Sequence, residues 1–271
     1  MKSTGTALTS SIFRPLKYEK RNILITVKAY PVPSISYGET VCCAGIDLKS
    51  NEWIRLWPVP YRDLELQKRF KKYDVVEVSC GKAAADKRPE SYKIVPESIK
   101  IIDRISSNDK WRRRKQLVFA MPIKSQCFIE CESREKDTSL GIVKPEQIKF
   151  SYKKRPASSP EERRACYAQY GLFIPKKDPV EEIPFIFYYE FKCFSMPACP
   201  GHKLPILDWE IGQAYRKFRE KSKDQTETLK KVEMKWLDIS NSAKKDVYFY
   251  VGNQLRFRDQ FAVLGVFWPP L

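Results

Sequence analysis

Histidine and glycine are both scarce in this chain of 271 residues, and their scarcity excludes several classes of enzyme. His202 is the single histidine, so a Ser-His-Asp triad or a Cys-His pair would have to use it. Among the 10 glycines, no two have the spacing of a phosphate-binding loop, and there is no Gly-x-Gly pair. The sequence therefore argues against ATPases, GTPases and classical NAD enzymes, and against metal centres built mainly of histidine.

Long apolar runs are also missing from the chain. The longest apolar stretches, such as residues 261–270, are too short to cross a bilayer. Residues 1–22 contain no apolar segment of the kind found in secretion signals. Because 8 cysteines without an export signal are typical of a reducing compartment, we expect a cytoplasmic protein with free or metal-bound thiols and no membrane partner.

Positive charge, in contrast, is abundant. The chain has 50 lysines and arginines against 33 aspartates and glutamates, which gives a formal net charge of +17. An excess of this size in a chain of this length indicates a polyanionic partner. We therefore expect nucleic acid, either DNA or RNA, as a partner.

A small β-barrel is predicted for the first half of the chain. After a basic tail at residues 1–22, short runs rich in valine, isoleucine and aromatic residues are separated by turn signals. Short strands at this spacing are typical of an OB-like or similar small barrel. We assign residues 23–155 to this region, as one or two barrels, with a helix at 110–121 and further strands at 126–133 and 139–154.

A second, α+β domain is predicted at residues 165–271. Asp208 and Asp224 stand as N-cap residues before two amphipathic segments, which predict consecutive helices. Strands are predicted by four apolar segments, at residues 185–193, 203–207, 246–251 and 261–267. The fold class expected for the whole chain is therefore α+β, with the barrel region first.

One strand of the predicted barrel has the composition of a nucleic-acid-binding surface. The two-residue period of a β-strand places Trp53, Arg55 and Trp57 on one face. Two aromatic rings with an arginine between them can stack on bases and contact a phosphate, as in oligonucleotide-binding barrels. The alternative is that both tryptophans cover the barrel core and only the charged end of Arg55 reaches water.

Basic clusters beyond this strand would extend a positively charged groove. The candidate residues form two segments, Arg62, Arg69, Lys71 and Lys72 in the first and Arg112, Arg113 and Arg114 in the second. The second segment is expected on a helix, where its charges spread around more than half of the circumference. Such a helix can equally be a solvated face that Trp111 anchors.

The single histidine lies in a turn-rich segment next to two cysteines. Cys193, Cys199 and His202 follow the pattern Cys-x5-Cys-x2-His between two predicted strands. Two thiolates and an imidazole in a short turn can bind a structural zinc ion, and a fourth ligand would close its tetrahedron. The sequence leaves the fourth ligand open: Cys166, the nearest cysteine outside this segment, is the best candidate, and Cys127 and Cys131, which form a Cys-x3-Cys pair, are more remote. The alternative is two buried cysteines and a surface histidine.

Acidic residues leave open a second class of function, a metal-dependent nuclease. Asp178 followed by Glu190 and Lys192 has the order Asp…Glu-x-Lys of restriction-endonuclease-like enzymes, although acid-x-Lys triplets arise by chance in so charged a chain. Asp208 could also bind a divalent cation. Its alternative role is the helix N-cap.

Two parts of the chain resemble uncharacterised bacterial proteins that contain one or two OB-like domains. The resemblance lies in a Cys-Ala-Gly-Ile strand at 43–46, a Trp-Ile-Arg strand at 53–55 and a Ser-Leu-Gly strand at 139–141. The segment CPGHKLPILDWE, residues 199–210, is similar to a Cys/His knuckle in such proteins, some of which are encoded near defence or mobile-element genes. The resemblance implies a barrel that binds nucleic acid and assigns no catalytic residues.

The function expected from these observations is nucleic-acid binding by a subunit or module of a larger bacterial system, together with other protein subunits. The resemblance extends this expectation to genome defence. A metal-dependent nuclease and a protein-interaction scaffold are the alternatives. Degradation of an oligonucleotide with Mg²⁺ would indicate the nuclease, and salt-sensitive retention of intact nucleic acid would separate a binding protein from a scaffold.

Overall fold

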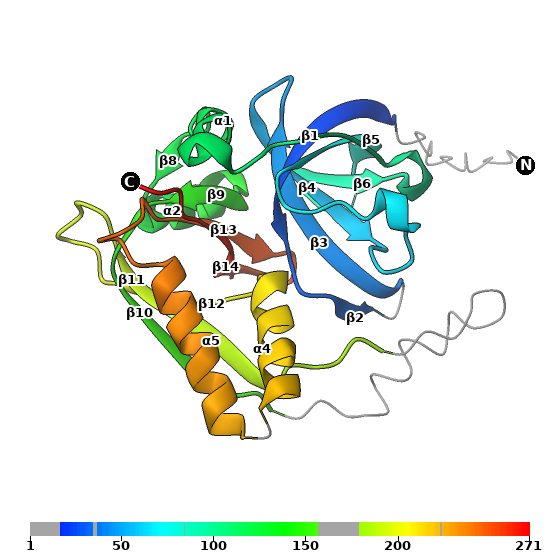
Figure 1. Cartoon of the computed structure of the whole chain (residues 1–271). Coiled ribbons are helices and arrows are strands. Elements are labelled where there is room, and N and C mark those ends of the chain that lie inside the picture. The colour runs from blue at the N-terminus through cyan, green and yellow to red at the C-terminus, as the bar shows by residue number, and fades with distance from the viewer. Residues whose placement is uncertain (1–16, 35–36, 84, 157–178, 223) are drawn as a thin grey trace, which may run out of the picture.

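The computed structural model describes residues 17–34, 37–83, 85–156, 179–222 and 224–271. The fold is α+β, as expected, because an N-terminal β-barrel is followed by a region of helices and smaller sheets (Figure 1). Most of the predicted basic tail lies outside the described residues.

The barrel is one sheet that closes on itself. Its strands pair in the order β1, β3, β4, β6 and β5, and β5 pairs back to β1. The strand β2 is added to β3, and β7 to β5. The bounds are β1 (Glu19–Lys28), β2 (Val32–Ser34), β3 (Gly38–Asp47), β4 (Glu52–Val59), β5 (Asp74–Lys82), β6 (Ser91–Ile94) and β7 (Lys100–Arg104), with 3-10 turns at Leu66–Lys68 and Pro96–Ser98.

Alternation of side chains along the strands fills this barrel. Ile54 and Leu56 of β4 are buried in a core cluster with Ile23 of β1 and Val76 of β5. The residues between them face the other way because successive side chains of a strand point to opposite sides. Arg55 therefore lies on the outside of the barrel wall, toward the C-terminal region.

The C-terminal region combines helices with two small sheets. Strands β10, β11 and β12 form one sheet, and β8, β9, β13 and β14 form the other. The described elements are α1 (Asn108–Val118), β8 (Ile123–Lys124), α2 (Gln126–Lys136), β9 (Leu140–Val143), β10 (Pro145–Lys154), β11 (Phe185–Cys193), β12 (His202–Pro205), α4 (Trp209–Lys221), α5 (Gln225–Ile239), β13 (Tyr248–Gln254) and β14 (Phe257–Phe267). None of these helices is both long and apolar enough to span a membrane.

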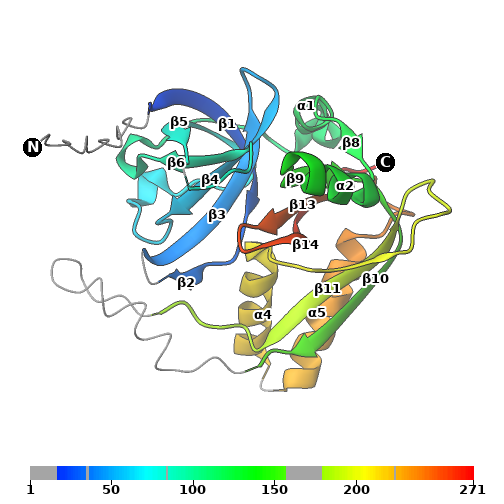
Figure 2. The ribbon, with the colours of Figure 1, turned by 180° about the vertical axis from the view of Figure 1, so that it is seen from behind.

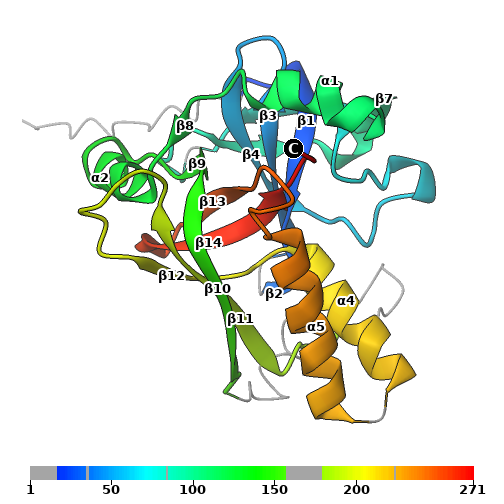
Figure 3. The same cartoon turned by 60° about the vertical axis from the view of Figure 1, so that its left-hand side comes forward.

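The two consecutive helices and the last two strands of the sequence analysis are confirmed. Asp208 accepts a hydrogen bond from the Glu210 amide at the start of α4, at 3.0 Å. Asp224 accepts from the Thr226 and Glu227 amides at the start of α5, at 2.9 and 3.3 Å. The strands β13 and β14 pair antiparallel. Both helices lie on the same side of β10 and β11, which leaves the other side of these strands facing outward (Figures 2 and 3).

Two expectations about the middle of the chain differ from the structure. Residues 126–133, expected as a strand, belong to α2, which Ser125 caps and which buries Gln126 and Ile129 at helical spacing. The strands expected within 139–154 do not complete the barrel, because β9 pairs with β13 and β10 pairs with β11. Sheet pairing therefore places these strands with the C-terminal region.

The barrel and the C-terminal sheet share a hydrophobic core. Leu24 and Ile46 on the barrel wall pack in one cluster with Tyr250 and Leu264 of the hairpin, and all four are buried. Trp53 meets the Tyr250 ring edge-on, with 6.0 Å between ring centroids. Because burying each large apolar side chain contributes about 1.5–3 kcal/mol, separating the two regions would expose a costly surface.

A buried ion pair also joins the barrel to α4. The Lys72 ammonium lies 2.9 and 2.7 Å from the two carboxylate oxygens of Asp208. Both side chains are less than a tenth exposed. Burial disfavours the charged lysine, but the Asp208 and Glu210 carboxylates raise the pKa of Lys72 above its ordinary value. Asp208 therefore caps a helix and binds the barrel at the same time.

Loss of the lysine charge should destabilise the fold. Lys72→Met leaves the Asp208 carboxylate buried without its cation, which costs about 3–5 kcal/mol of unfolding free energy. Asp208→Asn keeps an N-cap side chain, so the double variant Lys72→Met/Asp208→Asn should recover part of that loss. Urea unfolding of the three variants measures the coupling. A Lys72→Met protein as stable as the wild type would contradict this role for the pair.

Candidate functional site

Four potential metal ligands from distant parts of the sequence meet at one point. Cys127, Cys193, Cys199 and His202 each offer one ligand atom, and these atoms all lie within 4.8 Å of one another. Cys193 and Cys199 are buried, and the His202 side chain is only 5% exposed. The four residues could therefore hold a metal ion.

Regular elements and one tight turn position these ligands. Cys193 ends β11 and His202 begins β12, so the two strands deliver them side by side. The turn between them places the Cys199 sulfur 3.3 Å from the Cys193 amide, which donates to it. Gly201, with φ of 90°, adopts a conformation in this turn that favours glycine. Cys127 comes from the first turn of α2.

The separations between ligand atoms fit a tetrahedral ion. The Cys127 sulfur lies 3.8 Å from the sulfurs of both Cys193 and Cys199. The His202 Nε2 lies 3.3 Å from the Cys127 sulfur and 3.5 Å from the Cys193 sulfur. Metal bonds of about 2.3 Å to sulfur and about 2.0 Å to nitrogen, at tetrahedral angles, would place sulfurs about 3.8 Å apart and sulfur about 3.5 Å from nitrogen.

A carboxylate orients the histidine from its other side. The Nδ1 atom of His202 lies 3.3 Å from a carboxylate oxygen of Glu130, which follows Cys127 by three residues on α2. Burial opposes ionisation of Glu130, but its hydrogen bond with His202 lowers the pKa of Glu130 below its ordinary value. A carboxylate on the second nitrogen is the usual support for a metal-binding histidine, because it fixes the ring orientation.

The thiols of the cluster differ in how readily they ionise. Burial and the neighbouring thiols raise the pKa of Cys127 to about 12. Burial also acts against ionisation of Cys199, but amide hydrogen bonds from Cys193 and Gly201 lower the pKa of Cys199 to about 7. Because thiolates are the ligating form, metal binding would release protons from Cys127 and Cys193, whose pKa values are raised.

The fourth ligand differs from the residue that the sequence suggested. Cys166 lies outside the described residues, and the position completing the cluster is taken by Cys127. The sequence analysis assigned residues 126–133 to a strand of the barrel region and so kept Cys127 apart from the knuckle. Cys131, one turn further along α2, is exposed. The Cys-x3-Cys spacing thus presents one cysteine to the cluster and the other to solvent.

The exposed platform expected on β4 is not formed. Trp53 is half-buried against Tyr250, and Arg55 is only 4% exposed. Trp57, at the end of the strand, is 36% exposed and meets Tyr37 edge-on, with 5.3 Å between ring centroids. The expectation failed because the C-terminal hairpin covers this face of the barrel.

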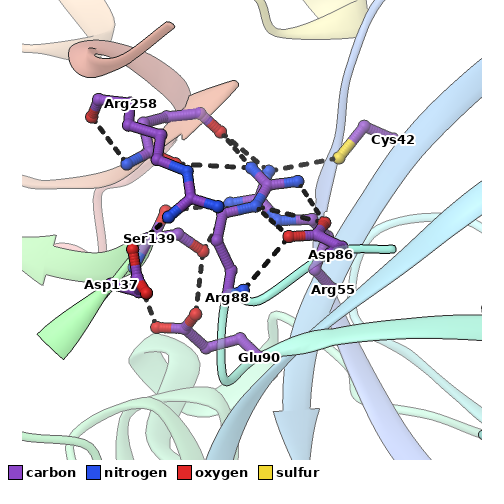
Figure 4. A network of polar contacts seen from close by, with 9 residues as sticks. Cys42, Arg55, Asp86, Arg88, Glu90, Asp137, Ser139 and Arg258 are labelled. Carbon is purple, nitrogen blue, oxygen red and sulfur yellow. Dashed lines mark hydrogen bonds and ion pairs between the residues drawn. The ribbon is translucent and has the colours of Figure 1, made fainter. Parts of the chain in front are cut away.

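Arg55 joins the barrel to the C-terminal sheets (Figure 4). Its guanidinium donates to the main-chain carbonyls of Asn253 and Ser139, each at 2.9 Å. Arg88 donates to the same Asn253 carbonyl at 2.9 Å and forms an ion pair with Asp86 at 2.6 Å. Two cations of the barrel region thus converge on one carbonyl oxygen of β13.

The two arginines differ in how their charge is compensated. Burial disfavours ionisation of Asp86, but hydrogen bonds from Arg88 lower the pKa of Asp86 to about 2. Glu90 accepts from the Ser139 amide and hydroxyl, at 3.0 and 2.8 Å. Arg55 instead donates to neutral acceptors, two carbonyls, the Ser139 hydroxyl and a thiol. Burial lowers the pKa of Arg55 from its ordinary value.

The basic segment at 62–72 does not form a free groove. Arg62 pairs with Glu39 at 2.7 Å, and Lys72 is the buried partner of Asp208. Arg69 donates to two main-chain carbonyls of its own loop. Lys71 is exposed. Most of this segment therefore holds the loop and the junction together.

The basic residues of α1 are only partly free. Arg112 and Arg113 are exposed, and each pairs with an aspartate, Asp109 and Asp103. Arg114 is half-buried, with its guanidinium 4.1 Å from the centroid of the Tyr73 ring. This agrees best with the alternative reading of the segment as a solvated helix face.

The residues suggested for a nuclease do not gather in the described structure. Asp178 lies outside the described residues. Asp208 is buried in its ion pair with Lys72. Glu190 and Lys192 point outward from β11, where Glu190 pairs with Lys203 at 2.6 Å. In the described part of the chain, these acidic groups form no cluster able to hold a metal ion.

A basic sheet face was missed by the sequence analysis. Along β11, buried residues alternate with outward residues that include Tyr188, Glu190 and Lys192. Pairing places Ser151 of β10 and Pro205 of β12 beside Tyr188. We call this surface the outer sheet face; its charged and aromatic residues are Glu146, Lys149, Lys153, Tyr188, Glu190, Lys192 and Lys203. The alternation on β11 was visible in the sequence, but its neighbours depend on strand pairing.

A cavity of about 750 Å³ opens where the barrel meets the C-terminal region. Arg55, Arg88, Trp57 and Tyr37 line it from the barrel region. The turn between β13 and β14, the beginning of β11 and the beginning of α4 line the rest. A volume of this size lies within the usual range for small-molecule sites. We call it the junction cavity.

Comparisons with known proteins divide the chain near the point where the barrel region ends. Residues 19–120 match a family model described as Domain of unknown function (DUF8758), and residues 122–271 match one described as Domain of unknown function (DUF8757). No curated protein and no solved structure matches the chain. Since the second model covers more than half of its length, the chain belongs to the family described as Domain of unknown function (DUF8757).

Proposed function

We propose that this protein binds nucleic acid, and that the outer sheet face is its principal contact surface. The observation that carries the proposal is the composition of this face: four lysines and a tyrosine stand with two glutamates on a side of the β10–β11–β12 sheet that the described residues leave uncovered. The apolar side of the same sheet packs against α4 and α5. The polar side is therefore free to meet a partner.

The chemistry of this face suits a nucleic-acid strand. The ammonium groups of Lys153 and Lys203 lie 5.5 and 5.4 Å from the centroid of the Tyr188 ring. Lysines beside an aromatic ring on a sheet allow a base to stack while the neighbouring phosphates are neutralised. Lys203 already pairs with Glu190, and Glu146 lies opposite Lys192, so the local excess of charge comes from Lys149 and Lys153.

Binding is better supported than hydrolysis. Glu190, one of the two carboxylates on this face, accepts from the Ser151 hydroxyl at 2.8 Å and pairs with Lys203. Its pKa is lowered by these hydrogen bonds, which keep it ionised but already occupied. A two-carboxylate metal site of the kind used in nucleases is not assembled around it by the described residues.

We infer that the metal ion of the Cys/His cluster is zinc with a structural role. Three sulfurs and one imidazole nitrogen in tetrahedral positions are the donor set and geometry of structural zinc sites. Four protein ligands leave no position for a reacting water. The ion would tie α2 to the end of β11 and the start of β12, and so support the sheet that carries the outer face.

Cys127→Ser should therefore abolish stable zinc binding. The wild-type protein, purified without chelator, should contain about one zinc per chain, and the variant far less, because a three-ligand site binds more weakly. Elemental analysis measures the content. Cys131→Ser is the matched control, since this exposed cysteine lies on the same helix. Equal zinc in the two variants, or none in the wild type, would refute the site.

Three substitutions on the outer sheet face should weaken binding of nucleic acid. The triple variant Lys149→Gln/Lys153→Gln/Lys192→Gln removes three cations that can each neutralise a phosphate. The slope of log affinity against log salt should become shallower by about 2 for single strands. Fluorescence anisotropy of labelled 12-nucleotide DNA and RNA strands, at several salt concentrations, gives this slope.

A charge-matched variant separates this face from the overall charge. Lys217→Gln/Lys230→Gln/Lys244→Gln removes three exposed lysines from α4, α5 and the following turn, on the other side of the sheet. This variant should keep nearly the wild-type affinity. An equal loss in both triple variants would assign binding to net charge alone, and no binding by the wild-type protein would reject the function.

A further inference from the structure

The junction cavity has a lining that the outer sheet face does not explain. Arg55 and Arg88 line it together with Trp57, Tyr37 and Arg256. These residues come from the turn before β3, from β4 and the loop before β6, and from the turn between β13 and β14. The cavity therefore exists only when the barrel and the C-terminal hairpin are assembled.

Cations outnumber carboxylates in this lining, which contains Arg55, Arg88, Arg155 and Arg256 against Glu181, Glu182 and Asp208. Arg55 is 4% exposed, and all its hydrogen bonds to the described residues go to neutral acceptors, so no carboxylate neutralises it directly. Three carboxylates also line the cavity: Asp208 is paired with Lys72, Glu181 is paired with Arg219, and Glu182 is the third. A buried cation without a carboxylate partner makes the surrounding cavity favourable for an anion.

Aromatic rings stand next to this charge. Arg55 and Trp57 are two residues apart on β4, so their side chains leave the same face about 7 Å apart. Trp57 packs edge-on against Tyr37, and both line the cavity. Arg256, exposed on the hairpin turn, contributes a further cation to the lining. A planar group can lie against the rings while an attached anion meets the arginines.

We propose that the junction cavity holds one nucleotide unit, with its base against Trp57 and Tyr37 and its phosphate near Arg55 and Arg256. The volume, the aromatic wall and the charge of Arg55, which contacts no carboxylate directly, each fit a flat ring that carries an anion. The proposal rests on the proposed function, because the nucleotide belongs to a strand that the outer sheet face also contacts. A free mononucleotide has the same chemistry, and the test separates the two sources.

Trp57→Ala should weaken the binding of single strands by about 5- to 100-fold, because a stacked base is lost. Arg256→Gln should weaken it less, by removing one phosphate contact. Phe257→Ala is the matched aromatic control, since Phe257 is exposed on the same hairpin but lies outside the lining. Anisotropy with 12-nucleotide DNA and RNA strands gives the affinities, and competition with AMP and dAMP tests the free nucleotide.

Photo-crosslinking locates the contacts independently. Strands that carry one 5-iodouracil are irradiated with the wild-type protein, and the crosslinked peptides are identified by mass spectrometry. Peptides containing Trp57 or Tyr37 support the cavity. If the strands bind with wild-type affinity to both cavity variants and crosslink only at Tyr188, the cavity proposal is overturned and the proposed function stands.

Two other outcomes are equally informative. Binding of AMP or dAMP that requires Trp57, without any binding of strands, would support a nucleotide cavity and overturn nucleic-acid binding. If Trp57→Ala lowers the melting temperature strongly, the exposed Arg256→Gln variant decides the matter through its affinity and its crosslinks. Wild-type values for that variant in both measurements would count against the cavity.

Discussion

The carbonyl oxygen of Asn253 accepts hydrogen bonds from both Arg55 and Arg88, and the relation between the two halves of the molecule depends on this contact. A buried guanidinium needs acceptors for its donors, because leaving them unpaired away from water is costly. Ser139 supplies a further carbonyl to Arg55. The barrel wall can therefore bury its arginine only where β13 and the residues before β9 lie against it.

The burial of Arg55 against β13 also explains where the neighbouring tryptophans lie. Because Arg55 points toward β13, Trp53, two residues before it on the same face of β4, packs against Tyr250 in the shared core. Trp57 on the other side stays at the edge, 36% exposed, where the junction cavity opens. Trp53, Arg55 and Trp57 thus occupy successive outward positions of β4, because side chains alternate along a strand at fixed spacing. Trp53 packs in the shared core, Arg55 forms the polar contact with β13, and Trp57 lines the junction cavity.

The metal cluster and the outer sheet face are physically linked through the same strands. Cys193 and His202 end β11 and begin β12, so an ion held there with Cys127 would fix both strands to α2. Tyr188 lies on the outward side of β11, between β10 and β12. The basic residues of the two regions differ in their contacts. Arg62 and Lys72 of the barrel loops are held in ion pairs within the fold, whereas the lysines of the outer sheet face stay accessible.

The sequence by itself determined the α+β class, the caps Asp208 and Asp224 and three of the four residues of the Cys/His cluster, because periodicity, capping and short turns are local. Tertiary structure decided the rest. Cys127 is 66 residues from Cys193, and the carbonyl partners of Arg55 lie 84 and 198 residues away. No local pattern specifies contacts at such separations, since strand pairing and burial depend on the whole chain. The sequence therefore does not show whether an arginine is buried or exposed, because packing in the folded chain decides this.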